Sequence, residues 1–235
     1  MSKKTSRVIR VAISILFFGC TTNHAIKFPG EILFQPQTEK QPFSVGIFVS
    51  PEDKALPFDQ CEKLTGGSMC YHGVAGTLLE PSAYQAFQQA FENVVLLDNL
   101  AGPQAQKANF VVALSFREVR LDTAVDGFVA TRKVTVALRE QVFAGSKNIS
   151  DRELKEATSC LAYQCKVEGR DVGLSGSEVV LKTLFVPGYL SGIGGRYGGI
   201  ISTAYSASLK AILLRSSEDL ASKAASLLNP SSRLR

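Results

Sequence analysis

The fold is decided by residues 110–142, which read FVVALSFREVRLDTAVDGFVATRKVTVALREQV. Apolar side chains alternate with other side chains on both sides of Asp126-Gly127, a pair typical of a tight turn. Alternation with a period of two indicates a strand with one buried face. We therefore predict a long antiparallel hairpin whose two strands bury these side chains: Phe110, Val112, Leu114 and Phe116, then Val134, Val136, Leu138 and Val142.

Upstream of the hairpin, the pattern predicts a strand over 43–49, a long loop over 51–81 and a short strand over 94–97. Ser82 is a suitable N-cap for a helix between that loop and the short strand. The fold class that we predict is α+β, a small, mostly antiparallel sheet packed by helices with a long C-terminal helix.

Downstream of the hairpin, three helices are predicted. Ser150 and Glu153 have the spacing of a capping box, which favours a short helix leading to Cys160. A second short helix is expected over 177–184. A final helix is expected from Ser202 to Leu228, where Pro230 ends it, because its apolar residues repeat at helical spacing.

The charge of the chain is concentrated at its N-terminus. The chain has 235 residues and a net charge of +5, and 45% of its residues are hydrophobic, which excludes a disordered chain. Residues 1–19 hold four basic side chains and no acidic one, which leaves 22 basic and 21 acidic groups in the remainder. A nearly neutral body lacks the basic surface that nucleic-acid binding requires. We expect no nucleic-acid partner.

The first 20 residues have the order of a secretory leader. The basic stretch 1–10 precedes an apolar run over 11–18 that is too short to span a bilayer. The run ends in Phe17-Phe18-Gly19-Cys20, which resembles the lipobox of bacterial lipoproteins, and a polar segment follows. This resemblance implies cleavage after Gly19 and a covalent diacylglycerol and N-acyl lipid on Cys20, and we expect no other cofactor.

The resemblance also sets the predicted domains and location. Residues 1–19 are a signal peptide, 20–42 a lipidated tether rich in proline and glutamine, 43–229 a single periplasmic α+β domain and 230–235 a basic tail. Thr21, at the position where aspartate retains lipoproteins at the inner membrane, resembles the outer-membrane class. We expect a lipid-anchored protein on the periplasmic face of the outer membrane.

The other cysteines are even in number, as expected in an oxidising compartment. Cys61, Cys70, Cys160 and Cys165 allow three pairings, and we favour the local one, Cys61–Cys70 and Cys160–Cys165, because it closes two short loops. The alternative is a metal site that these cysteines form with His72. The spacing of the first cysteine pair is outside the usual range for zinc, so we predict no metal.

No nucleophile elbow, zinc-binding helix motif or phosphate loop occurs in the sequence. We therefore predict no catalytic residues and a protein that is not an enzyme.

The most unusual stretch is 184–214, LFVPGYLSGIGGRYGGIISTAYSASLKAILL. Glycines four residues apart allow backbones to approach closely when a helix packs in lipid or on a partner. Under that interpretation, the contact residues would be Gly188, Gly192, Gly194, Gly195, Gly198 and Gly199, with Tyr189 and Tyr197 as interfacial anchors. The alternative, which we favour, is a flexible loop before the last helix, because repeated glycine disfavours helix.

The predicted element order and Ala108-Asn109-Phe110 resemble the periplasmic α+β domains of envelope-assembly lipoproteins over residues 43–143. This resemblance implies a non-enzymatic accessory or assembly subunit of a cell-envelope complex. Two alternatives remain: a transport-auxiliary lipoprotein that carries a hydrophobic ligand or lipid, and a pore- or ring-forming oligomer built through 184–214. The expected partners are the membrane, through the lipid anchor, and an envelope protein or further copies of the chain.

Overall fold

A computed structural model of the chain describes residues 20–29, 32–34, 39–64, 67–126, 129–161, 164–167, 170–171 and 192–228. Its centre is the hairpin of β6 (Phe110–Asp126) and β7 (Val129–Ala144), which pair antiparallel as predicted. Along β7, Val134, Val136 and Leu138 are fully buried. The alternating pattern thus identified both the hairpin and its buried face.

The large sheet has seven strands in the order β10-β9-β8-β7-β6-β2-β5. β2 (Gln41–Val49) lies between β6 and β5 (Phe91–Leu97) and runs parallel to both. β8 (Lys147–Leu161), β9 (Gln164–Val167) and β10 (Arg170–Asp171) extend the other side in antiparallel pairs. Parallel neighbours need a crossover, and α3 (Leu79–Ala90) lies between β2 and β5 in the chain.

A second, smaller sheet has the order β1-β4-β3. β1 (Cys20–Ala25) runs parallel to β4 (Gly67–Val74), and β3 (Pro57–Leu64) runs antiparallel to β4. The chain is therefore mostly β, with two mixed sheets and one long C-terminal helix. The predicted α+β class with a small, mostly antiparallel sheet is wrong.

Several predicted elements differ from the observed ones. The loop over 51–81 holds α2 (Pro51–Lys54), β3, β4, the 3-10 helix η1 (Ala75–Leu78) and the start of α3. Ser82 lies inside α3 and is not its N-cap. The capping-box segment at Ser150 belongs to β8, because its residues pair with β7. The predicted helix over 177–184 lies outside the described residues.

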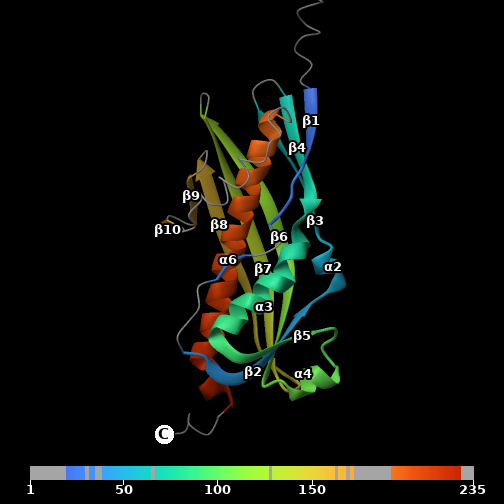
Figure 1. The fold of residues 1–235 in the computed structure, drawn as a ribbon, viewed down its shortest axis with the longest axis vertical. Coiled ribbons are helices and arrows are strands. Elements are labelled where there is room, and N and C mark those ends of the chain that lie inside the picture. The colour runs from blue at the N-terminus through green and yellow to red at the C-terminus, as the bar shows by residue number, and fades with distance from the viewer. Residues whose placement is uncertain are drawn as a thin grey trace, which may run out of the picture.

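One face of the large sheet is covered by α3 and α6 (Gly192–Leu228) (Figure 1). α6 begins ten residues before the predicted start at Ser202. Between the helices and the sheet lies the main core, which includes Phe87, Leu138 and Tyr205. On the other face, α4 (Pro103–Lys107) contributes Ala105 to a small cluster with Leu97 and Val111.

Candidate functional site

Cys20, the residue predicted to carry the lipid, is the first residue of β1. β1 pairs with β4 from Cys20 beside Gly67 to Ala25 beside His72. Figure 1 places the start of β1 at one end of the molecule, together with the start of α6. We call this end the anchor end, after the lipid predicted on Cys20. The segment predicted as a tether therefore contributes a paired strand from its first residue.

After β1 the chain continues along α6 as an N-terminal strap, which we define as residues 26–29 and 32–34. Ile26 and Ile32 are buried in the main core. The other contacts follow α6 in sequence order: the Ser202 hydroxyl donates to the Lys27 carbonyl at 3.3 Å, Phe28 packs edge-on against Tyr205, and Lys210 Nζ lies 5.6 Å from the ring centroid of Phe34. The strap holds the start of the chain against its last helix.

The four remaining cysteines form the two local disulfides that the sequence favoured. Cys61–Cys70 joins residues that face each other in the β3–β4 hairpin. Cys160–Cys165 joins facing residues of β8 and β9. Each bond therefore connects the two strands of a hairpin close to its turn.

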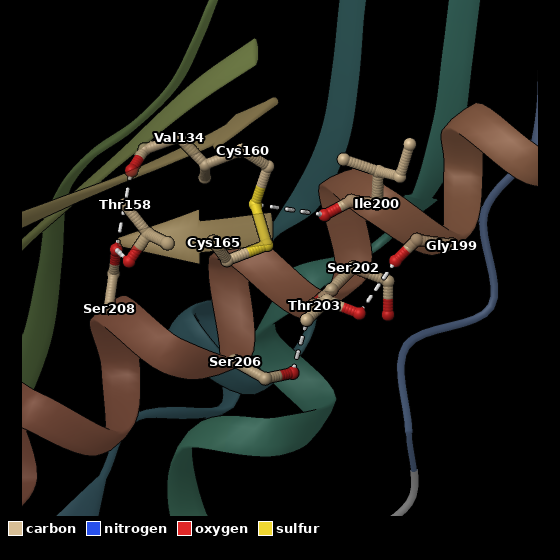
Figure 2. Close-up of a disulfide and its surroundings, with 10 residues drawn as sticks. All are labelled: Val134, Thr158, Cys160, Cys165, Gly199, Ile200, Ser202, Thr203, Ser206 and Ser208. Carbon is tan, nitrogen blue, oxygen red and sulfur yellow. Dashed lines mark hydrogen bonds between the residues drawn. A yellow bond between two sulfur atoms is a disulfide. The ribbon is translucent and has the colours of Figure 1, made fainter. Parts of the chain in front are cut away.

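Figure 2 shows how the second disulfide meets α6. Cys160 is fully buried, and its Sγ lies 4.0 Å from the Ile200 carbonyl oxygen. About two turns further along α6, Ser208 Oγ lies 2.7 Å from Thr158 Oγ1 and donates to the Val134 carbonyl at 3.3 Å. These polar contacts fix α6 against β7 and β8.

A buried ionic cluster joins the two sheets. Arg132 of β7 donates from Nη2 to Glu62 Oε1 of β3 at 2.8 Å. The same carboxylate accepts hydrogen bonds from the Tyr71 hydroxyl at 2.5 Å and from Thr123 Oγ1 at 2.7 Å. Desolvation, and next the bond to the carboxylate, raise the pKa of Tyr71, so its phenol stays protonated and keeps donating.

This ionic cluster lies between the two disulfides. Glu62 directly follows Cys61, and Arg132 pairs in register with Cys160. Sequence reasoning missed both charged residues. The sequence nevertheless indicates that Arg132 is buried. It falls in the same alternation as the buried residues Val134 and Val136 and so occupies an inward position.

The metal alternative does not fit this arrangement. Its four cysteines are engaged in disulfides, and His72 Nδ1 lies 2.9 Å from Asp59 Oδ1 on the exposed side of the small sheet. Among the residues that the structure describes, no group of three or more histidine, cysteine, aspartate or glutamate side chains could hold a metal ion.

The glycine-rich segment is helical where it is described. Gly192, Gly194, Gly195, Tyr197, Gly198 and Gly199 lie in the first turns of α6, so the favoured loop interpretation is wrong for them. Gly198 is buried, and a Cβ built on it would lie 3.6 Å from Ile26 Cγ1 of the strap. Gly188 and Tyr189 lie outside the described residues. Contact of this segment with a membrane or a partner stays a prediction.

Comparisons with known proteins add two structural likenesses. No family model matches the chain, and no curated protein matches it. The fold is similar to that of a DUF330 protein from Xanthomonas campestris, at 10% identity and a TM-score of 0.46 over 87% of this chain and 97% of that one. It is also similar to a hypothetical protein from Chlamydia trachomatis, at 16% identity and a TM-score of 0.26 over 50% of this chain and 73% of that one.

Within the described ranges, no helix is both long enough and apolar enough to cross a bilayer.

Proposed function

We propose that this chain is a lipid-anchored protein of the bacterial cell envelope, held through Cys20 on the periplasmic face of the outer membrane. We propose further that it is a non-enzymatic accessory or assembly subunit of an envelope complex. One observation carries the proposal: the basic and apolar leader ends at Cys20, and Cys20 also begins β1. Cleavage before Cys20 would therefore remove the leader and leave every described strand intact.

The two disulfides support an oxidising compartment. Protein disulfides persist outside the cytosol, where thiol reductants do not reach them. Both bonds join facing residues of antiparallel hairpins, and Cys160 is sealed from solvent. A bacterial protein with such bonds is suited to the periplasm.

The buried charges support a structural role and not a catalytic one. Glu62 pairs with Arg132, Glu140 with Arg152 and Glu156 with Arg215. A catalytic acid or base needs access to substrate, whereas each of these acids is engaged with a cation of a neighbouring element. The first pair joins the two sheets, the second joins β7 to β8, and the third joins β8 to α6.

Exposed apolar side chains at the edge of the large sheet support a protein partner. Val95, Leu96 and Leu100 are exposed, and they lie in or directly after β5, the edge strand of the large sheet. Figure 1 shows β5 towards the end of the molecule opposite the anchor end. An edge strand presents unpaired backbone groups to which a partner strand can bond, and exposed apolar side chains on it add contact area. A partner could thus reach this edge while the anchor end faces the membrane.

Palmitate labelling tests the anchor. Cys20→Ser should abolish incorporation of labelled palmitate and leave an unprocessed or soluble protein. The matched control is the Cys160→Ser/Cys165→Ser double variant, which also removes cysteine but should keep the label. Undiminished labelling of Cys20→Ser would end the lipoprotein proposal.

Membrane fractionation tests which membrane holds the protein. Thr21→Asp should move the protein from outer-membrane to inner-membrane fractions, because it places aspartate directly after the acylated cysteine. Thr21→Ser is the control and should stay in the outer membrane. An inner-membrane location of the unaltered protein would refute the outer-membrane assignment.

The native mass of the detergent-extracted protein tests the accessory role. We expect a mass above that of the monomer, and a Leu96→Lys variant should lose the added mass. Val74→Lys, an equally exposed site on the small sheet, is the control. A monomeric mass that does not change in Leu96→Lys would contradict a role as a subunit.

A further inference from the structure

Two large apolar side chains are exposed where the central strands end. Val125 is next to last in β6 and 45% exposed, and Leu161 is the last residue of β8 and 47% exposed. We call these two residues the sheet tip. Neither belongs to β5, and neither is among the buried residues of the main core.

The strand register places the two side chains level with each other on opposite faces of the sheet. Val125 faces Ala130 of β7, and Leu161 faces Thr131 of the same strand. Because Ala130 and Thr131 are consecutive, their side chains point to opposite faces, and so do those of Val125 and Leu161. The sheet tip is therefore apolar on both sides.

The sheet tip lies at the anchor end. The Phe116 amide of β6 donates to Asp53, and further along β6 the Thr123 hydroxyl donates to Glu62. Asp53 lies in α2, just before β3, and Glu62 lies near the end of β3, so the chain from α2 through β3 follows the direction of β6. β3 ends at Leu64, which pairs with Gly67, and Gly67 pairs with Cys20. Figure 1 shows the end of β6 and the start of β7 on the same side as the start of β1.

We propose that the sheet tip inserts end-on into the headgroup region of the membrane that holds the Cys20 lipid. The proposal rests on the proposed lipid anchor. Acyl chains at Cys20 would keep the tip at a high effective concentration beside the bilayer, so a small apolar contact is sufficient to orient the protein. A bilayer entered end-on covers both faces of the tip, whereas a protein packed on the sheet would cover one.

The neighbouring charges limit the depth of insertion. Asp126 follows Val125 and is exposed, and Lys133 is exposed on β7 beside Asp122. Charged side chains are costly in hydrocarbon but are tolerated among lipid headgroups. The tip therefore reaches the interface and stops there.

The absence of tryptophan from the sequence allows a sharp test. Val125→Trp and Leu161→Trp each introduce a single tryptophan at the tip. The control is Val95→Trp. Val95 pairs with Gly46, and Gly46 pairs with Val111 of β6. Val111 comes fourteen residues before Val125 in the same strand. At about 3.3 Å per residue this separation is roughly 45 Å. The acylated full-length variants would be reconstituted in phosphatidylethanolamine and phosphatidylglycerol vesicles that contain a brominated phosphatidylcholine.

We expect the emission of both tip variants to shift to shorter wavelength and to be quenched by the brominated lipid several-fold more than that of Val95→Trp. Tryptophan itself prefers the membrane interface, so a further variant tests whether the native Val125 side chain contributes to insertion. Adding Val125→Asp to Leu161→Trp should reduce the quenching, because the tip inserts as a unit. Thermal unfolding should be similar for all the variants, which shows that each one folds.

Each outcome decides the proposal. Quenching at both tip positions supports it. Vesicle-bound, acylated protein without quenching at either position overturns it and leaves the lipid anchor standing. Quenching at one position only indicates a face-on contact and also overturns it. If mass spectrometry finds no acyl chain on Cys20, the proposed function fails, and the proposal for the tip fails with it.

Discussion

Arg132 and Glu62 form a buried ion pair, in which the guanidinium Nη2 lies 2.8 Å from the carboxylate Oε1. The two side chains are 2% and 1% exposed. This pair joins the small sheet to the large one. Burying either charge alone is expensive, so each makes the other necessary.

Arg132→Met should therefore destabilise the protein by about 3–5 kcal/mol, because Glu62 would be left buried without its cation. Adding Glu62→Gln should recover part of this loss, since the amide is neutral: its oxygen can accept from one of the Tyr71 and Thr123 hydroxyls, and its NH2 can donate to the other. Urea unfolding of the two single variants and the double variant measures the coupling. A double variant no more stable than Arg132→Met would contradict the assignment.

The disulfides should contribute to stability independently of this pair. The bonded cysteines are nine and five residues apart, and closing such short loops contributes about 2–3 kcal/mol per bond in the chain-entropy view. Replacing either pair with serine should lower the free energy of unfolding by that amount. Alkylation of the denatured, unreduced mature protein should find only oxidised sulfur at these four positions, and four free thiols would refute the bonds.

Gly76 and Gly198 should respond to alanine in opposite directions. A Cβ on Gly76 would lie 2.0 Å from the Asp53 carbonyl oxygen, and because backbone cannot move aside cheaply, Gly76→Ala should cost at least about 3 kcal/mol. A Cβ on Gly198 would lie 3.6 Å from Ile26 Cγ1, an ordinary contact distance, so Gly198→Ala should stabilise α6 by about 0.5–1 kcal/mol. Thermal unfolding of both variants checks the contrast, and equal effects would disprove it.

Asp219 of α6 should make stability depend on pH in the acidic range. A hydrogen bond from Arg152 is the main cause that lowers the pKa of this carboxyl in the folded protein. A depressed folded pKa contributes stability above the unfolded pKa, about 3.9, and this stability is lost as pH falls through the lower folded value. The difference in unfolding free energy between the protein and Asp219→Asn should thus be present at neutral pH and vanish in strong acid.

Lys223→Gln is the matched control for this measurement. Its ammonium lies 3.6 Å from the same carboxylate and contributes less to the lowered pKa than Arg152 does. The pH dependence should therefore remain in Lys223→Gln. Arg152 itself is unsuitable for substitution because it also pairs with the buried Glu140. An Asp219→Asn difference that stays constant with pH would contradict the prediction.

Replacing two buried helical serines with alanine should have different effects on stability, because only one of the two hydroxyls is hydrogen-bonded. Ser82 Oγ has no hydrogen-bond partner among the described residues, so Ser82→Ala should be neutral or stabilising by up to about 1 kcal/mol. Ser208→Ala should cost about 1–3 kcal/mol, because Thr158 would lose its partner. Chemical unfolding measures both, and a destabilised Ser82→Ala would point to a bond in solution.

The elements predicted well are those whose inward residues are apolar. β6 and β7 follow this rule at most positions, and the pattern located both strands. β8 was mistaken for a helix because its inward positions include Glu156 and Thr158, which Arg215 and Ser208 of α6 satisfy. Local sequence cannot contain that information, since the partners lie 50 residues or more away in the chain.

The small sheet was missed for the same reason. β3 carries an inward glutamate, Glu62, whose cation lies on a different sheet 70 residues away. The parallel pairing of β2 with β5 and β6 also depends on crossovers that a local pattern does not specify. The cysteine pairing was accessible from sequence because short loops close easily, and the anchor prediction at Cys20 still awaits its labelling test.

The contact between the strap and α6 would limit the order in which the chain folds during the export that we propose. The Ser202 hydroxyl donates to the carbonyl of Lys27, 175 residues earlier. A chain that crosses the inner membrane from its N-terminus delivers the strap first and α6 last, so the strap has no surface to pack on until the last helix has been translocated. Contacts of such sequence separation form slowly and leave apolar surface open meanwhile. We expect the exporting chain to require a periplasmic chaperone, and protease should cut the strap until α6 has emerged.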